Sequence, residues 1–237
     1  FKVAKMSGRG LGHTGGTIDK LESIKGYQVN RSEEQFIEQV NKIGVSVISQ
    51  TSEVAIADKK IYALRDVTGL AESIPLIASS IMSKKIASSA SMIVIDVKVG
   101  NGALMKNVED ATTLANIMIQ IGKKFDRKVV CLLTNMEQPL GYAIGNGLEV
   151  EECIQLLQGK GPDDLRELVI ELASIYLEEL DTIAKETARE KVQEVISSGK
   201  AYQKFIDWIT YQNGNINQID ISKKIVSVKS TKSGILT

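Results

Sequence analysis

Short runs of β-branched and other apolar residues alternate along this chain with segments of helical periodicity. The strand-like runs lie at 1–6 (FKVAKM), 44–49 (GVSVIS), 91–97 (SMIVIDV) and 128–134 (KVVCLLT). Successive strands joined by helices lie side by side and run in the same direction. The alternation therefore predicts a three-layer α/β/α fold with a mostly parallel sheet covered on both faces.

Capping signals predict where two of the helices begin. Ser32 and Gln35 have the spacing of a capping box before a helix over 33–43. Asn107 predicts the start of a helix over 108–123. One apolar stripe is expected on that second helix, formed by Val108, Ala111, Ala115, Met118 and Ile121.

Residues 57–87 interrupt the alternation. They contain no strand signal and are typical of two helices, the second beginning near Ser73 and Pro75. In an α/β chain, a helical excursion of this kind indicates an inserted element or part of a separate helical lobe. A second helical series runs over 162–212. We therefore expect four parts: an α/β lobe in two sections, 1–56 and 88–222, the helical segment 57–87, and the start of a β-containing region, 223–237.

Composition limits the classes of partner. Lysine plus arginine and aspartate plus glutamate both number 29, so no charge excess favours nucleic acid or an anionic membrane. No apolar run approaches the roughly 20 residues that span a bilayer. Cys131 and Cys153 are expected to be reduced and partly buried, which fits the cytoplasm.

A glycine-rich segment, SGRGLGHTGG at 7–16, joins the first strand to the first helix. It lies at the carboxyl end of a strand, where α/β folds bind ligands. Its backbone N–H groups, with Lys5, Ser7 and Thr17, suit a phosphate, although a tight turn without a ligand is the alternative. His13 could act as a general acid or, as we favour, brace the loop by hydrogen bonding.

A second constellation lies in the helical excursion. Ile77, Ser80 and Lys84 are spaced to share one helix face, and Tyr62 and Arg65 share a face of the preceding helix. Arginine, lysine and serine together can bind a flat polar heterocycle through its carbonyl oxygens and ring N–H. Two ordinary amphipathic helices are the alternative.

Two loops complete the candidate sites. DVKVGNGA, at 96–103, is a glycine-bearing turn directly after a strand and is expected to border the same crevice. In QPLGYAIGNGLEVEE, at 138–152, irregular backbone carbonyls precede Glu152 and could hold a hard cation. A purely structural turn or loop is the alternative at both places.

Five segments, in the same order, resemble the thymidine and pyrimidine-nucleoside phosphorylases: 7–22, 57–68, 73–87, 96–105 and 138–150. The resemblance covers nearly the whole chain and weakens over 160–237. KMSGRG and SIMSKKIA look closer to the bacterial pyrimidine-nucleoside type. The resemblance implies phosphorolysis of nucleosides such as uridine and thymidine to the free base and α-D-(deoxy)ribose 1-phosphate. It also implies nucleoside salvage, a homodimeric parent enzyme, and an all-α lobe that closes onto an α/β lobe.

The resemblance also implies residue roles. Phosphate would be bound by Lys5, Met6, Ser7 and Thr17. The pyrimidine would be held, and its departure assisted, by Arg65, Ser80 and Lys84, with Leu11, Tyr62 and Ile77 as pocket walls. A potassium ion would be bound by the carbonyls of Leu140 and Ala143 and the carboxylate of Glu152.

One departure from the family pattern is large. The K-H-S-T-G-G segment that lies upstream in the family, with its histidine and further phosphate ligands, is absent, as are further helices and a C-terminal β-rich part. We therefore expect the chain to be a central portion that is inactive, or nearly so, by itself. The alternatives are an anthranilate-type phosphoribosyltransferase, against which the absence of a convincing acidic pair argues, and a non-catalytic nucleotide or sugar-phosphate binding module.

Overall fold

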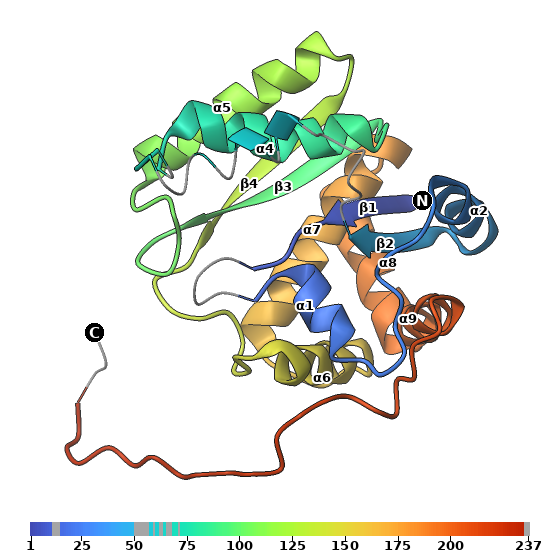
Figure 1. Ribbon diagram of the computed structural model, residues 1–237, viewed down its shortest axis with the longest axis vertical. Coiled ribbons are helices and arrows are strands. Elements are labelled where there is room, and N and C mark those ends of the chain that lie inside the picture. The colour runs from blue at the N-terminus through green and yellow to red at the C-terminus, as the bar shows by residue number, and fades with distance from the viewer. Residues whose placement is uncertain are drawn as a thin grey trace.

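The computed structural model describes residues 1–10, 15–49, 57, 58, 60, 61, 64, 68–70 and 72–234. Figure 1 shows helices arranged around short parallel strands. In chain order the elements are β1 (Val3–Ser7), α1 (Thr17–Glu22), α2 (Glu33–Ile43), β2 (Val45–Ser49), α4 (Ile74–Ala87), β3 (Met92–Val99), α5 (Val108–Lys124), β4 (Lys128–Asn135), α6 (Asn146–Leu157), α7 (Asp163–Asp181), α8 (Lys185–Ser197) and α9 (Lys200–Tyr211).

The strands confirm the predicted α/β class with parallel pairing. β1 pairs with β2 from Val3 opposite Val45, and β3 pairs with β4 from Met92 opposite Lys128. Among the residues that the structure describes, however, these pairs form two separate two-stranded sheets rather than one continuous sheet. Figure 1 shows the two pairs as distinct sets of arrows.

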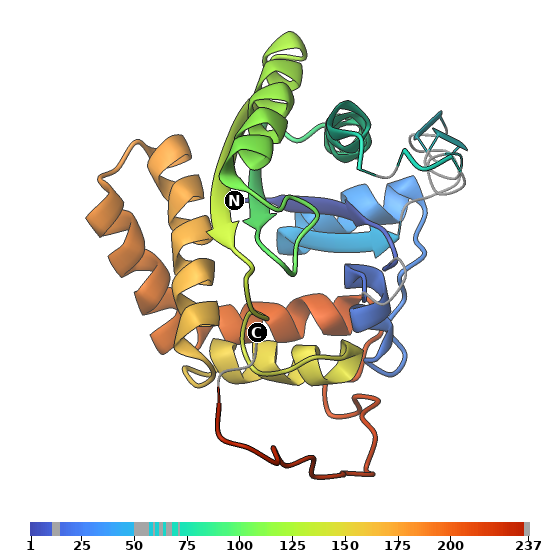
Figure 2. The same ribbon diagram turned by 90° about the vertical axis from the view of Figure 1, so that its left-hand side faces the viewer.

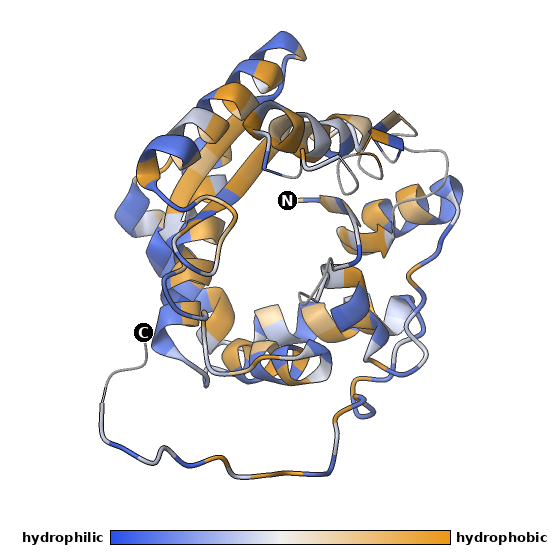
Figure 3. Cartoon of the chain, turned by 60° about the vertical axis from the view of Figure 1, so that its left-hand side comes forward, coloured by the Kyte–Doolittle hydropathy of each residue, from blue (hydrophilic) through white to orange (hydrophobic). Residues whose placement is uncertain are grey.

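Each strand pair has a hydrophobic core of its own. The first core joins β3 to α4 and α5, and its fully buried members include Ala78, Ala111 and Met118. The second joins β2 to α1, α6 and α9 around Ile18 and Ile209. Figure 3 shows apolar residues along β3 and β4 and on the inner faces of the surrounding helices.

Both predicted helix starts are confirmed. The Ser32 hydroxyl accepts the Gln35 N–H, and the Gln35 side chain accepts the Ser32 N–H. The Asn107 side chain accepts the Asp110 N–H at 2.8 Å. The predicted stripe on α5 was wrong at one position, because Val108 is 64% exposed. Val108 is the first residue of the helix, where the chain has not yet reached the core.

Helices α7 and α8 form an antiparallel pair at one side of the molecule (Figure 2). Glu171 of α7 forms ion pairs with Lys185 and Arg189 of α8. After α9 the chain continues as an extended tail, residues 223–234, with no strand partner in the described part of the chain. None of the described helices is both long and apolar enough to cross a membrane.

Both cysteines are free thiols, as expected. Cys131 is half-buried, and burial raises its pKa to about 11. Cys153 is exposed, so the expectation of partial burial was wrong for this residue, which lies on a solvent-facing position of α6.

Candidate functional site

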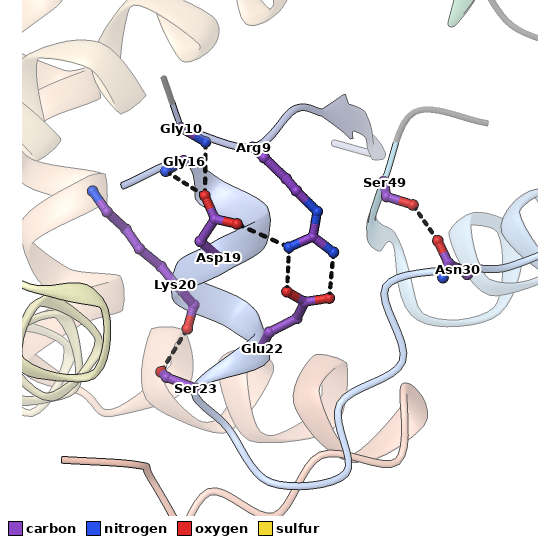
Figure 4. Close-up of polar contacts among 9 residues, drawn as sticks. All are labelled: Arg9, Gly10, Gly16, Asp19, Lys20, Glu22, Ser23, Asn30 and Ser49. Carbon is purple, nitrogen blue, oxygen red and sulfur yellow. Dashed lines mark hydrogen bonds and ion pairs between the residues drawn. The ribbon is translucent and has the colours of Figure 1, made fainter. Parts of the chain in front are cut away.

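The glycine-rich segment is tied together by one carboxylate at the start of α1. Asp19 accepts the N–H of Gly10 at 2.7 Å and the N–H of Gly16 at 2.9 Å, and it forms an ion pair with Arg9. Arg9 also forms a paired hydrogen bond with Glu22 (Figure 4). Asp19 therefore joins the two described ends of the loop, a role that the sequence analysis missed although its position three residues after Gly16 is a capping signal.

Three of the predicted phosphate ligands lie in β1 and a fourth begins α1. Lys5, Met6 and Ser7 are half-buried in β1, and Thr17 is the first residue of α1. The strand thus ends where the glycine-rich segment begins, as the sequence predicts. Burial lowers the pKa of Lys5, and the positive charge of Lys20 lowers it further.

Helix α4 presents the predicted base-binding residues. Ser80 is buried, and the ammonium of Lys84 lies 3.4 Å from its hydroxyl. Lys84 also forms an ion pair of 3.2 Å with Asp58, whose side chain is only 9% exposed. The partner carboxylate was not anticipated from the sequence. Ile77 packs in the core with β3 and α5, so its role as a pocket wall stays a prediction.

A cavity of about 320 Å³ brings Lys5 close to α4 and β3. It is lined by Lys5 of β1, Ile81 and Lys85 of α4, Val94, Ile95 and Asp96 of β3, and Leu172 and Tyr176 of α7. The pKa of Lys85 is lowered by burial and then by the charges of Lys5 and Lys84. Lys5 of the predicted phosphate site therefore shares this cavity with Lys85, a residue that sequence reasoning missed and that follows the predicted base-binding Lys84.

The last part of β3, where the predicted 96–103 segment begins, adjoins the same region. Lys98 forms an ion pair with Asp96 at 2.9 Å and donates to the Thr134 hydroxyl at 3.0 Å. Thr134 in turn donates to the second carboxylate oxygen of Asp96 at 2.5 Å. Since Asp96 lines the cavity together with Lys5, the predicted proximity of the 96–103 segment to the crevice is supported at its first residue.

Glu152 organises the loop that precedes α6. It is only 8% exposed, and one carboxylate oxygen accepts the N–H groups of Tyr142 at 2.9 Å and Ala143 at 3.1 Å. Gly141, with φ +69°, lies so close that a Cβ there would be 2.3 Å from the other carboxylate oxygen. The carboxylate and this loop are thus adjacent, as the predicted cation site requires, and the loop holds the carboxylate by backbone donors.

Several predicted residues lie outside the described part of the chain. They are Leu11, His13, Tyr62 and Arg65. A larger cavity, of about 680 Å³, lies between α1, the start of α6 and residues 220–226, away from the predicted site residues.

Comparison with known proteins places this arrangement in a family. The sequence model described as "Glycosyl transferase family, a/b domain" matches residues 1–202. This chain belongs to that family. Curated relatives named pyrimidine-nucleoside phosphorylase include those of Staphylococcus haemolyticus, 51% identical over 99% of this chain, and Bacillus subtilis, 50% identical over 99%. The relative from Geobacillus stearothermophilus is 50% identical over 96%.

This glycosyl transferase domain is thus a homologue of the pyrimidine-nucleoside phosphorylases, and it spans about half of their length. The alignments cover 56% of the Staphylococcus haemolyticus and Bacillus subtilis proteins and 53% of the Geobacillus stearothermophilus protein. Lys5 and Lys85 line a crevice with two cationic side chains beside the carboxylate of Asp96. Such a crevice can hold an anion and stabilise negative charge that develops during a reaction.

Proposed function

We propose that these residues form the central part of a pyrimidine-nucleoside phosphorylase. The observation that carries the proposal is that Lys5 of the predicted phosphate subsite lines one cavity with Lys85, the helical neighbour of the predicted base-binding residue Lys84 on α4. The homology to enzymes of that name, at about half identity over nearly the whole chain, supports it.

In the proposed reaction a phosphate oxygen attacks C1′ of uridine or thymidine, and the bond between C1′ and the base nitrogen breaks. The electron pair of that bond passes to the pyrimidine, so negative charge develops on the base. Lys84, together with Arg65, would stabilise that charge, and Ser80 would hydrogen bond to the ring. Lys5, Met6, Ser7 and Thr17 would hold phosphate below C1′, where positioning supplies much of the rate.

Asp58 fits this scheme as the residue that positions Lys84. A carboxylate that is only 9% exposed and lies 3.2 Å from the ammonium fixes the direction of the lysine side chain. The Ser80 hydroxyl, 3.4 Å from the same ammonium, lies on the same helix one turn away. The proposed base-binding groups are therefore held by the fold before any ligand binds.

The same proposal includes a potassium ion bound by the Leu140 and Ala143 carbonyls and Glu152. Glu152 is placed beside that loop by the Tyr142 and Ala143 N–H groups, which supports the assignment of the loop as a unit. A bound monovalent cation would fix the loop and neutralise the carboxylate. Assembly of the parent enzyme as a homodimer and a cytoplasmic location belong to the same proposal.

The test is a chimera in which this chain replaces the aligned part of the Bacillus subtilis relative. We expect the chimera to convert uridine and phosphate to uracil, measured by the change in base absorbance. Lys84→Ala should lower kcat/KM by about a hundredfold or more, as expected when a group that stabilises developing charge is removed. Lys60→Ala, at an exposed lysine of the same segment, is the matched control and should leave the rate unchanged.

A folded chimera without uridine phosphorolysis, beside an active Bacillus subtilis protein, would refute the proposed activity. Equal rates for the Lys84→Ala and Lys60→Ala chimeras would refute the proposed role of Lys84 while leaving the activity standing.

A further inference from the structure

The side chain of Lys20 runs from α1 back toward the glycine-rich segment (Figure 4). A Cβ built on Gly15 would lie 3.7 Å from the Cε atom of Lys20, and the ammonium nitrogen is the next atom along that side chain. The positive charge of Lys20 is therefore placed beside Gly15, in the segment for which we propose phosphate binding.

The first turn of α6 holds Lys20 in this direction. The Lys20 ammonium forms an ion pair with Glu149, and each of the two side chains is 31% exposed. Glu149 also accepts the N–H of Gly145 at 3.3 Å, which ties its carboxylate to the start of its own helix. This anchored carboxylate restricts the directions that the paired lysine can adopt.

Asn146, the first residue of α6, keeps the glycine-rich segment close to that helix. A Cβ on Gly15 would lie only 2.3 Å from the amide oxygen of Asn146. Glycine at position 15 therefore lets the segment approach the helix more closely than a residue with a side chain would. Gly15, Lys20 and the first turn of α6 form one packed unit.

Lys20 and Lys5 approach the predicted phosphate site from two elements. Lys5 belongs to β1, which leads into the glycine-rich segment, and Lys20 belongs to α1, which follows it. The positive charge of Lys20 contributes, after burial, to the lowered pKa of Lys5. Two like charges in one region repel each other, and an anion bound close to both offsets that repulsion.

Hydrogen-bond donors remain on Lys20 for a ligand. An ammonium group carries three N–H donors. In the described part of the chain, its ion-pair partner is one oxygen of Glu149. Arg9 differs, because it pairs with two carboxylates, those of Asp19 and Glu22, and 59% of its side chain is exposed. Lys20 is therefore better placed than Arg9 to bind an anion.

We propose that Lys20 is a further phosphate-binding residue, which donates to a phosphate oxygen from the α1 side while Lys5 donates from the β1 side. Glu149 is its positioning residue. The inference rests on the proposed function, because the ligand is the phosphate of that reaction. Phosphate carries more than one negative charge near neutral pH, and Lys20 gives the proposed site a second positive charge.

The contact with Lys20 would form as soon as phosphate binds. An interaction made equally in the bound state and in the transition state affects binding rather than the chemical step. Loss of the Lys20 charge should therefore raise the Kd and the KM for phosphate. It should change kcat and the KM for uridine little.

The test uses the chimera described above, with inorganic phosphate as the probe. Isothermal titration calorimetry gives the Kd for phosphate, and steady-state kinetics with uridine give the two KM values. Lys20→Gln should raise the Kd and the KM for phosphate by about tenfold or more, as for a lost hydrogen bond to a charged group. The KM for uridine should change by less than about twofold.

Three further variants separate the charge from the fold. Lys20→Arg keeps a positive charge and phosphate donors and should retain most of the affinity. Lys25→Gln, at an exposed lysine shortly after α1, is the matched control and should leave the Kd unchanged. Lys20→Met, which keeps the apolar stem, replaces Lys20→Gln if circular dichroism shows that this variant does not fold.

A double-mutant cycle tests the role of Glu149. Glu149→Gln should raise the Kd for phosphate when Lys20 is present, because the lysine loses its anchor. It should cause no rise when combined with Lys20→Gln. A rise in both backgrounds, or a fall in the Lys20 background, would refute the positioning role.

Equal phosphate affinities for the unaltered and Lys20→Gln chimeras would overturn the inference. So would equal losses in Lys20→Gln and Lys25→Gln, which would show only an effect of net charge. A chimera that binds phosphate through Lys20 without converting uridine would refute the proposed activity and leave the Lys20 assignment standing. A folded chimera that binds no phosphate would refute both.

Discussion

Gly141 carries the strongest single-residue constraint in the Glu152 loop. Its φ of +69° favours glycine, and a Cβ there would lie 2.3 Å from a Glu152 carboxylate oxygen. We expect Gly141→Ala to lower the free energy of unfolding by about 3 kcal/mol, combining the backbone cost with displaced hydrogen bonds to the Glu152 carboxylate. Urea denaturation measures this.

Gly159 is the matched control, because its φ is +80° and a Cβ there would contact nothing within 4 Å. Gly159→Ala should cost about 1 kcal/mol, the backbone contribution alone. Equal losses in the two variants would show that the Glu152 carboxylate is not held by this loop.

The carboxylate of Asp19 should make the free energy of unfolding depend on pH. The Gly10 N–H is the main cause of its lowered pKa, followed by the Gly16 N–H and Arg9. Because the pKa is lower in the folded state, the stabilisation is complete above the unfolded pKa of about 4 and is lost as pH falls through the folded pKa. Asp19→Asn should therefore cost about 1 kcal/mol at neutral pH, as for a lost cap, and progressively less in acid.

Urea denaturation over a pH series tests this, with Asp163→Asn as the control at a side chain that is 97% exposed. A difference between Asp19→Asn and the unaltered protein that stays constant down to acid pH would contradict the assignment.

Part of the proposed base-binding site could be predicted from the sequence, because the spacing of residues determines which side chains share a helix face. Ser80 and Lys84 do lie together on α4. Asp58 was missed, since a carboxylate that pairs with a cation distant in sequence has no sequence signal of its own. Lys85 was missed because its closeness to Lys5 depends on how α4 packs beside β1. Gly10 and Gly16 were expected to serve a ligand, but their N–H groups bind Asp19.

At the scale of elements, Gln212 joins four parts of the chain just after α9. It is fully buried, and its side-chain oxygen accepts the Trp208 ring N–H at 2.8 Å and the Gln39 amide at 3.0 Å. Its amide donates to the carbonyls of Gln28 at 2.9 Å and Val47 at 3.0 Å. Gln212 thus connects α9 and α2 to the outer edge of β2.

We expect Gln212→Leu to lower the free energy of unfolding by about 3 kcal/mol, because it leaves several buried donors and acceptors unpaired. Gln203→Leu, on an exposed position of α9 with one bond to Asp207, should change it by less than about 0.5 kcal/mol. Thermal or urea denaturation compares the two. Similar losses would show that the buried network contributes little.

Elements were well predicted because strand and helix signals here are local. All four strands lie within two residues of their predicted ends, and the caps at Ser32 and Asn107 form as expected. Gln212 could not be predicted, since its partners at 28, 39 and 47 are distant in sequence. The separation of the strands into two pairs could not be predicted from the sequence either, because periodicity does not show which strands are neighbours.

At the scale of the whole molecule, the two strand pairs contribute to one cavity of about 320 Å³, which Lys5 of β1 lines together with residues of β3. Lys5 is also a predicted phosphate ligand, and precise positioning of reacting groups supplies much of an enzyme's rate. The chain spans about half the length of its curated relatives. We therefore propose that efficient phosphorolysis needs the remainder of such a protein.

The most direct measurement is uracil release from uridine and phosphate by the 237-residue chain alone, beside the chimera and with an intact mass to confirm 25.8 kDa. We predict turnover by the chimera and none, or nearly none, by the chain alone. Robust turnover by a chain of that mass would contradict the account, because it would show that the residues present here complete the catalytic site without any further segment.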